Sequence, residues 1–224
     1  MTKIVCISDT HTAHYKLKVP DGDILIHAGD FTNHGEQQDI INFATWLRSL
    51  PHKTKIVVPG NHDIMFERNE SFARELLNDS CHLLICQSME SHGLTFYGTP
   101  WSPDFFPHHW VFNHAQESIH AKRIHEDIMD IYPDVIISHS PPFGYLDGCP
   151  DLDNPFEEVH VGCKVMLQTI EELQPKLFVC GHIHEGYGTA KIGRTHVINA
   201  SCMTGRYRLE NKPIIIAVYS GQQV

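Results

Sequence analysis

The stretch that decides the fold occupies residues 3–11 and reads Lys-Ile-Val-Cys-Ile-Ser-Asp-Thr-His. Its first five residues form a short apolar, β-branched run, which predicts a strand buried on both faces. Asp9 and His11 follow directly after that run. Ligand sites of α/β sheets form at the carboxyl ends of the strands. The segment therefore predicts a central strand and the beginning of a functional site.

Four later segments repeat this pattern of an apolar run followed by polar side chains. The runs lie at 23–28, 55–58, 135–138 and 176–180. Asp30 follows the first of these runs, and Asn61, His62 and Asp63 follow the second. His139 follows the third, and His182 and His184 follow the fourth. Each motif alone is weak, because Asp, Asn and Gly are common turn residues. Five such motifs in succession predict one shared site at one edge of a sheet.

Apolar runs alternate with segments of helical period along the chain. The periodicity predicts helices at 36–50, 70–78, 114–131 and 160–173, with Asn113 as the N-cap of the third, and further strands at 82–85, 94–97, 196–199 and 214–218. This alternation predicts an α/β protein with a mixed sheet. The last strands have no helices between them, which predicts a second, partly antiparallel sheet. No linker or repeat interrupts residues 1–224, so we interpret them as a single domain.

Composition excludes several classes of protein. The chain has 224 residues, of which 42% are hydrophobic and 20% are charged, as is typical of a globular protein. No apolar run reaches the roughly 18 residues of a membrane span, and the first residues lack a signal-peptide pattern. We therefore expect a cytoplasmic protein without a membrane partner. The net charge of −10 argues against binding to a long nucleic acid.

Histidine and cysteine usage points to metal chemistry rather than disulfides. The chain contains 18 histidines, more than its 17 lysines and arginines together. Histidine is the commonest metal ligand. The seven cysteines form no C-x-x-C pair, and Cys6 and Cys180 lie inside strand-like runs. We expect them to be reduced and mostly buried.

The polar residues at the strand ends have the chemistry of metal ligands. Seven of them offer oxygen or nitrogen donors: Asp9, His11, Asp30, Asn61, His139, His182 and His184. Seven donors are too many for one tetrahedral zinc and suit two metals that share a carboxylate. Two such ions can hold a bridging hydroxide and clamp phosphoryl oxygens during in-line attack. The mixed ligation suits Mn, Fe or Zn, and the residues do not choose among them.

These motifs resemble the complete signature of the calcineurin-like metallophosphoesterases. The motifs are Asp9-x-His11, Gly29-Asp30, Gly60-Asn61-His62-Asp63, His139 and Gly181-His182-x-His184. Further segments are similar to the MPPED-type (metallophosphoesterase domain-containing) phosphodiesterase subfamily: Thr99-Pro100-Trp101, His139-Ser140-Pro141-Pro142, His160-Val161-Gly162-Cys163 and Ile198-Asn199-Ala200-Ser201. The resemblance implies a four-layer α/β/β/α sandwich of two mixed β-sheets flanked by helices.

The resemblance also implies a role for each site residue. Asp9, His11 and His184 would hold one metal. Asn61, His139 and His182 would hold the other, and Asp30 would bridge both. His62 would face the phosphate, where it would stabilise charge or protonate the leaving oxygen. Asp63 would orient the ring of His62, since a carboxylate partner fixes an imidazole and raises its basicity.

The expected substrate is a small phosphodiester or nucleotide, such as a cyclic nucleotide. The sequence shows neither a separate cap domain nor a basic groove, so a small exposed ester fits better than a long polymer. Candidate substrate-binding residues are Trp101, which could stack a base or simply pack a loop, His34 and Arg206. The proline-rich stretch at 140–158 is long for a connection in a compact domain, which favours a functional role such as a lid.

Two alternatives remain open from the sequence. One is a phosphomonoesterase or phosphoprotein phosphatase. Protein phosphatases of this superfamily place arginines near the Asn-His motif, whereas here Asp63 is followed by Ile64-Met65-Phe66. The other is a catalytically weak module that binds a nucleotide or a partner on the same fold. The intact set of ligand-type residues argues against this module. The residues do not indicate an oligomeric state.

Overall fold

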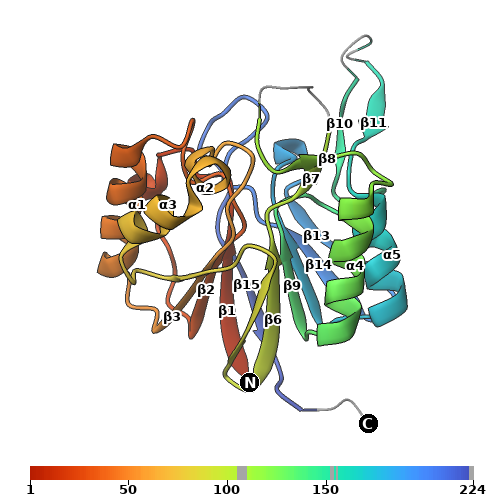
Figure 1. Ribbon diagram of the computed structural model, residues 1–224, viewed down its shortest axis with the longest axis horizontal. Helices are drawn as coiled ribbons and strands as arrows, with labels where there is room; N and C mark the ends of the chain where they lie inside the picture. Colours follow the sequence, from red (N-terminus) through yellow and green to blue (C-terminus); the bar gives the residue numbers. More distant parts are fainter. Residues whose placement is uncertain (105–109, 152–153, 155, 222–224) are drawn as a thin grey trace.

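Two mixed β-sheets packed face to face form the centre of the protein, as a computed structural model of residues 1–104, 110–151, 154 and 156–221 shows (Figure 1). The first sheet has the strand order β15-β1-β2-β3-β4. Its strands are β1 (Thr2–Ile7), β2 (Ile24–His27), β3 (Thr54–Val57), β4 (His82–Leu83) and β15 (Ile214–Val218). Strands β1 to β4 are parallel, and β15 is antiparallel to β1.

The second sheet has the order β13-β14-β12-β9-β6-β5. Its strands are β5 (Gln87–Ser91), β6 (Leu94–Thr99), β9 (Val135–Ser138), β12 (Leu177–Cys180), β13 (Gly188–Ile192) and β14 (Thr195–Asn199). The four inner strands are parallel, and the two edge strands are antiparallel to their neighbours. A second, partly antiparallel sheet is confirmed, but the last predicted strand is not part of it, because β15 pairs with β1 of the first sheet.

Helices cover the outer face of each sheet (Figure 1). On the first sheet lie α1 (Gln37–Ser49), α2 (Met65–Arg68) and α3 (Glu70–Leu77), and on the second lie α4 (Ile119–Ile131) and α5 (Lys164–Leu173). Two single-turn 3-10 helices, η1 (His14–Lys16) and η2 (His184–Gly186), follow β1 and β12. The predicted four-layer α/β/β/α sandwich is confirmed.

Alternating side chains of the inner strands hold these layers together. On β1, Ile4 and Cys6 lie in the core between the two sheets, whereas Val5 and Ile7 pack toward α1 and α3. On β12, Val179 belongs to the core between the sheets and Phe178 to the core beneath α4 and α5. Each such side chain contributes about 1.5–3 kcal/mol on burial. Burial on both faces explains the nearly uninterrupted apolar runs.

Two predicted helix boundaries are wrong. The third helix begins at Ile119, and its N-cap is Ser118, whose side chain accepts a hydrogen bond from Ala121 N. The segment Asn113–His114 instead forms strand β8, which pairs with β7 (Ser102–Pro103). The fourth helix begins at Lys164, because residues 158–160 form strand β11 (Glu158–His160).

The long stretch at 140–158 contains the first strand of a two-stranded ribbon. Strand β10 (Gly148–Pro150) pairs antiparallel with β11, and the ribbon projects beyond the carboxyl ends of the inner strands (Figure 1). The buried carboxylate of Asp147 ties its base. It accepts hydrogen bonds from the backbone N–H of Gly144 and Gly162, and it contacts His160 Nδ1 at 2.7 Å.

Two smaller expectations are also answered. All seven cysteines carry free thiols, and Cys6, Cys163, Cys180 and Cys202 are buried. Among the described residues, each helix is too short or too polar to cross a bilayer.

Candidate metal centre

The carboxyl ends of strands from both sheets meet at one place, where the two sheets approach each other closely. Ser8, directly after β1, pairs with Ser201 after β14. A Cβ atom at Gly181 would overlap Ser8 and Asp9, and one at Gly60 would overlap Asp30 and His139. Only glycine permits these approaches. The local sequence thus brings polar side chains from distant strands into one cluster.

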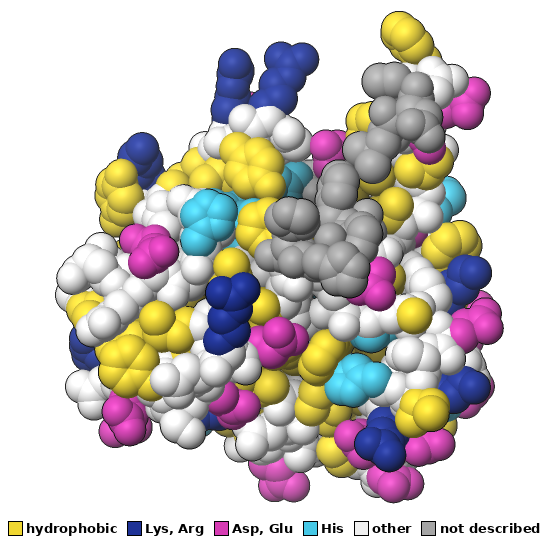
Figure 2. Space-filling model, turned by 45° about the horizontal axis from the view of Figure 1, so that its top comes forward, with side chains coloured by type: hydrophobic (Ala, Val, Ile, Leu, Met, Phe, Trp, Pro, Cys, Tyr) yellow, Lys and Arg dark blue, Asp and Glu magenta, His cyan; other side chains and the backbone are white. Residues whose placement is uncertain are grey.

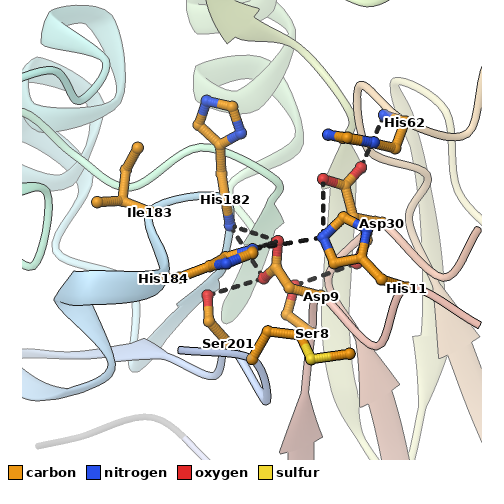
Figure 3. Close-up of polar contacts among 12 residues, drawn as sticks. Ser8, Asp9, His11, Asp30, His62, His182, Ile183, His184 and Ser201 are labelled. Atoms are coloured by element: carbon orange, nitrogen blue, oxygen red, sulfur yellow. Dashed lines mark hydrogen bonds and ion pairs between the residues drawn. The ribbon is translucent and has the colours of Figure 1, made fainter. Parts of the chain in front are cut away.

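The first group of the cluster contains Asp9, His11 and His184. His11 Nε2 and His184 Nε2 lie 3.4 Å apart, and His184 Nε2 lies 3.4 Å from Asp9 Oδ1. Figure 3 shows these side chains pointing toward one another. The backbone N–H of His182 and the hydroxyl of Ser201 donate to the Asp9 carboxylate.

The second group contains Asn61, His139 and His182. His139 Nε2 lies 2.9 Å from Asn61 Oδ1, and its Nδ1 contacts the carbonyl of Ala28 at 2.8 Å. Donor atoms of Asp30, His139 and His182 lie within 4.8 Å of one another. A backbone carbonyl at Nδ1 is the usual device that leaves the other ring nitrogen free for a metal.

Asp30 lies between the two groups. Its Oδ2 is 3.9 Å from His11 Nε2 and 3.4 Å from His139 Nε2. Its Oδ1 accepts a hydrogen bond from the backbone N–H of His62. The carboxylate is therefore within reach of both groups, as its predicted bridging position requires.

The spacing of the donor atoms fits divalent metal ions. Two ligand atoms that each lie about 2.1 Å from one ion are about 3.0 Å apart at a right angle and about 3.4 Å apart at the tetrahedral angle. Three donor pairs match these values, with His11–His184 and His184–Asp9 at 3.4 Å and His139–Asn61 at 2.9 Å. The donors of Asp9, His11 and His184 all lie within 4.8 Å of one another. The donors are carboxylate, amide and imidazole groups, without thiolate, which suits borderline metals such as Mn, Fe or Zn.

The electrostatics of the buried cluster also favour a cation. Burial raises the pKa of both Asp9 and Asp30, but neighbouring histidines outweigh it and hold both values below the usual range. Burial lowers the pKa of His11 to about 4 and that of His182 to about 3. Burial would also lower the pKa of His139, but the charge of Asp30 raises it to about 9. Burial would likewise lower the pKa of His184, but its contact with Asp9 raises it. Ionised carboxylates and neutral imidazoles are the forms that bind metal, so a cation would compete with the protons that these aspartates favour on His139 and His184.

His62 lies beside the cluster, and its ring is fixed by neighbours outside the cluster. Its Nδ1 lies 2.8 Å from the carbonyl oxygen of Asn33, and its ring centroid is 3.9 Å from that of Trp110 and 4.8 Å from that of His11. His34, a predicted substrate-binding residue, stacks on the ring of Trp110 at 6.0 Å. Trp110 belongs to the same aromatic-rich segment as Trp101, for which the sequence leaves base stacking and loop packing as alternatives.

Asp63 differs from its predicted role. Its buried carboxylate accepts hydrogen bonds from the backbone N–H groups of Asp30, Thr32 and Gly60 and from the Thr32 hydroxyl, at 2.8–2.9 Å. Within the described part of the chain, no hydrogen bond joins it to the ring of His62. The carbonyl of Asn33 orients that ring, and Asp63 instead fixes the backbone that carries Asp30.

A cavity of about 750 Å³ opens over the cluster. Its lining includes Asp30, Asn61, His62, His182 and His184, and Figure 2 shows histidine and hydrophobic side chains gathered on this face of the molecule. Its volume is in the range of small-molecule binding sites.

None of the three predicted substrate-binding residues is among the described residues that line this cavity. His34 stacks on Trp110 outside the lining. Trp101 packs on His120 and Phe112, which is the packing alternative considered from the sequence. Arg206 is exposed, and its neighbour Tyr207 lines the cavity instead. The signal for Tyr207 was its place in the turn after Asn199, but the direction of its side chain is not readable from sequence.

Comparisons with known proteins agree with this geometry. The family model described as Calcineurin-like phosphoesterase matches residues 2–186. Metallophosphoesterase domain-containing protein 1 of Homo sapiens is 35% identical over 240 residues, which cover 96% of this chain and 70% of that protein. Uncharacterized protein MJ1162 of Methanocaldococcus jannaschii is 28% identical, with 89% of this chain and 88% of that protein covered.

Solved structures share the architecture at low sequence identity. One crystal structure superposes with a TM-score of 0.66 at 18% identity, over 88% of this chain and 90% of the other. The protein TT1561 of Thermus thermophilus gives a TM-score of 0.60 at 14% identity, over 88% of each chain. At these identities the likeness shows the fold alone.

Proposed function

Because the chain belongs to the calcineurin-like phosphoesterase family, we propose that it hydrolyses small phosphodiesters, such as cyclic nucleotides, with two divalent metal ions. The observation that carries this proposal is the convergence of seven donor side chains in two groups that share Asp30. Candidate ions are Mn, Fe and Zn.

The residues that would hold the ions follow from the two groups. Asp9, His11 and His184 would bind one ion, Asn61, His139 and His182 the other, and Asp30 both. Bound ions would supply an activated water and neutralise negative charge on the phosphoryl oxygens. The protein contributes rigidity. Ser201 donates a hydrogen bond to the Asp9 carboxylate, Asp63 accepts one from the backbone N–H of Asp30, and the carbonyl of Ala28 fixes the ring of His139.

His62 is the proposed proton donor to the leaving oxygen. A neutral ring that donates its Nδ1 proton to the Asn33 carbonyl has its lone pair on Nε2, and protonation there creates a general acid. The ring also lies near enough to His11 and Asp30 to be considered a ligand. The experiment must therefore distinguish an acid from a ligand.

The cavity supports a small substrate. Its lining residues include no lysine or arginine among the described part of the chain, whereas Asp104, Asp151 and Glu185 contribute to it. A long nucleic acid needs rows of basic side chains to neutralise its phosphates. A single phosphate group, neutralised at the metal centre, does not.

The test is a screen of the metal-reconstituted protein against 3′,5′- and 2′,3′-cyclic nucleotides, an artificial diester and a monoester. His62→Ala should lower diester turnover by about 100-fold or more at unchanged metal content, since a positioned general acid contributes about 10²–10⁴-fold. His34→Ala, which removes another histidine beside Trp110, is the matched control and should change turnover little.

Three results would contradict parts of the proposal. Loss of metal in His62→Ala would make His62 a ligand. Hydrolysis of the monoester or of a phosphopeptide without the diesters would favour a phosphomonoesterase. A protein that binds no metal but holds a partner tightly would be a binding module.

A further inference from the structure

Tyr207 is an exposed aromatic residue that the proposed chemistry does not use. Its ring centroid lies 5.0 Å from that of His11 and 4.9 Å from that of His184. The side chain is nevertheless 57% exposed and lines the cavity over the cluster. An aromatic ring beside a cavity is able to stack on a planar group of a ligand.

The backbone holds Tyr207 in place from both sides. Its N–H donates to the carbonyl of Thr204 at 2.8 Å, and Thr204 N–H donates to the carbonyl of Arg208 at 2.9 Å. A bridge between Met203 and Leu209 closes the turn. Tyr207 itself has a φ of 54°, a left-handed conformation that is uncommon for an aromatic residue. The ring is thus presented by a closed turn rather than by a loose loop.

The hydroxyl of Tyr207 explains neither this placement nor the exposure. Among the described residues it takes part in no hydrogen bond, although its neighbour in sequence, Arg208, is tied back to Thr204. The aromatic ring, which is exposed and lines the cavity, is therefore the part of Tyr207 that we consider for binding.

Other walls of the cavity are apolar and acidic. The β10–β11 ribbon and the segment after it contribute Cys149, Pro150, Val159 and Val161, and Ile183 lies between the two ligands His182 and His184. In Figure 1 the ribbon and the loop between β14 and β15 rise on different sides of the strand ends. Such walls suit an uncharged organic group and disfavour a second phosphate.

We infer that Tyr207 is a substrate-contacting residue that stacks a planar, uncharged substituent of the phosphate ester, such as a nucleobase. This inference rests on the proposed function for the position of the phosphate. It adds the class of substituent and the residue that selects it. When an aromatic side chain that stacks one base is truncated, the affinity for the ligand falls on the order of 5- to 100-fold.

The test compares two ligands that share the phosphate and differ in the base. Calorimetry of the metal-loaded protein measures binding of adenosine 5′-monophosphate and of inorganic phosphate. In Tyr207→Ala the nucleotide should bind on the order of 5- to 100-fold more weakly, while phosphate affinity and metal content stay unchanged. Tyr207→Phe should behave as the wild type, because the ring and not the hydroxyl is used. Tyr207→Leu, which keeps apolar bulk against His11 and His184, should resemble Tyr207→Ala.

Tyr132→Ala is the matched control. Tyr132 has nearly the same φ of 55° and is 70% exposed, but it follows α4, and it is not among the described residues that line this cavity. Equal weakening of the nucleotide and of phosphate in Tyr207→Ala would overturn the inference, because it would indicate a disturbed metal centre. Unchanged nucleotide binding would overturn it as well.

The two proposals fail in distinguishable ways. If the wild type hydrolyses no ester, the proposed function fails, while the difference between nucleotide and phosphate binding still decides the role of Tyr207. If it hydrolyses cyclic nucleotides, Tyr207→Ala should raise KM by the factor lost in nucleotide binding and leave kcat within about 3-fold, as loss of uniform binding does. A fall in kcat alone would contradict the stacking role.

Discussion

Asp63→Asn decides whether Asp63 acts on His62 or on the backbone of the metal centre. The substitution keeps the shape of the side chain but replaces one acceptor oxygen with an NH₂ group. One oxygen of Asp63 serves the N–H groups of Asp30 and Gly60, and the other serves the N–H and hydroxyl of Thr32. Asparagine can satisfy only one of these pairs. If its oxygen serves Asp30 and Gly60, the Thr32 hydroxyl still has the carbonyl of His62 at 3.2 Å, but the Thr32 N–H loses its acceptor.

The expected loss follows from those contacts. A buried donor left without a partner, here the Thr32 N–H, costs about 1–3 kcal/mol. Burial and the negative charge of Asp30 raise the pKa of Asp63 to about 7. Removal of that unfavourable charge offsets part of the cost. We therefore expect the free energy of unfolding of the metal-free protein to fall by up to about 3 kcal/mol, as measured by urea denaturation.

Asp147→Asn is the matched control for stability. Asp147 is as buried as Asp63 and also accepts two backbone N–H groups on one oxygen, but it lies at the base of the β10–β11 ribbon. Both variants should lose stability. Only Asp63→Asn should also weaken metal binding, because Asp63 holds the backbone that carries Asp30.

A double-mutant cycle with His62→Ala completes the test. If Asp63 acted through the ring of His62, Asp63→Asn would have no further effect on turnover once the ring is removed. The structure instead predicts that the full effect persists. The reasoning would be refuted if metal affinity and stability stayed within about 0.5 kcal/mol of the wild type while the effect on turnover vanished in the His62→Ala background.

Three further predictions concern packing, metal and pH. Gly181→Ala places a methyl group against Ser8 and Asp9. Urea denaturation should show that the free energy of unfolding falls by about 1–3 kcal/mol. Because Asp9 is displaced, metal should also bind more weakly, and unchanged metal affinity in a calorimetric titration would contradict this account. A metal ion supplied at about 100 times its dissociation constant should raise the Tm by about 5–10 °C over the chelated protein, since it stabilises the folded state by about 2.7 kcal/mol; no shift in scanning calorimetry would argue against a preformed site. Burial lowers the pKa of His14 from 6.5 to about 4. Between these two pH values the unfolded chain binds a proton at His14 and the folded chain does not. The free energy of unfolding should therefore fall by up to about 3 kcal/mol as the pH is lowered from about 6.5 to about 4. His14→Phe should flatten that pH profile, and an unaltered slope would show that His14 is accessible to protons.

The sequence predicts the inner strands and the ligand set because both depend on local signals. Apolar runs such as residues 3–7 leave little choice but a buried strand, and glycines after the strands permit the close approach of the sheets. The sequence does not predict the start of α4, because Asn113 and Ser118 are equally good caps. The pairing of β8 with β7, which removes Asn113 from the helix, is a tertiary contact.

The sequence also does not predict the edge strands or the contacts that hold the candidate ligands in place. Strand β5 is largely polar and half-exposed, and only its pairing with β6 makes it a strand. Asp63 follows His62 directly, which favours a contact between them, but its carboxylate turns to backbone groups that lie 31–33 residues earlier and at Gly60. Side-chain direction from a loop depends on the packed structure, as Tyr207 and Arg206 show.

The span of sequence that the metal centre joins has a consequence for how the protein matures. The carboxylate of Asp9 is held by groups 173 and 192 residues further along the chain. At about 5–20 residues per second, a ribosome takes about 10–35 s to add that length. During this time the first carboxylates and histidines are synthesised without their partners, and closing so long a loop carries a large entropic cost. The cluster therefore assembles only after Ser201 has been synthesised, and metal binding that needs the complete cluster must follow that point.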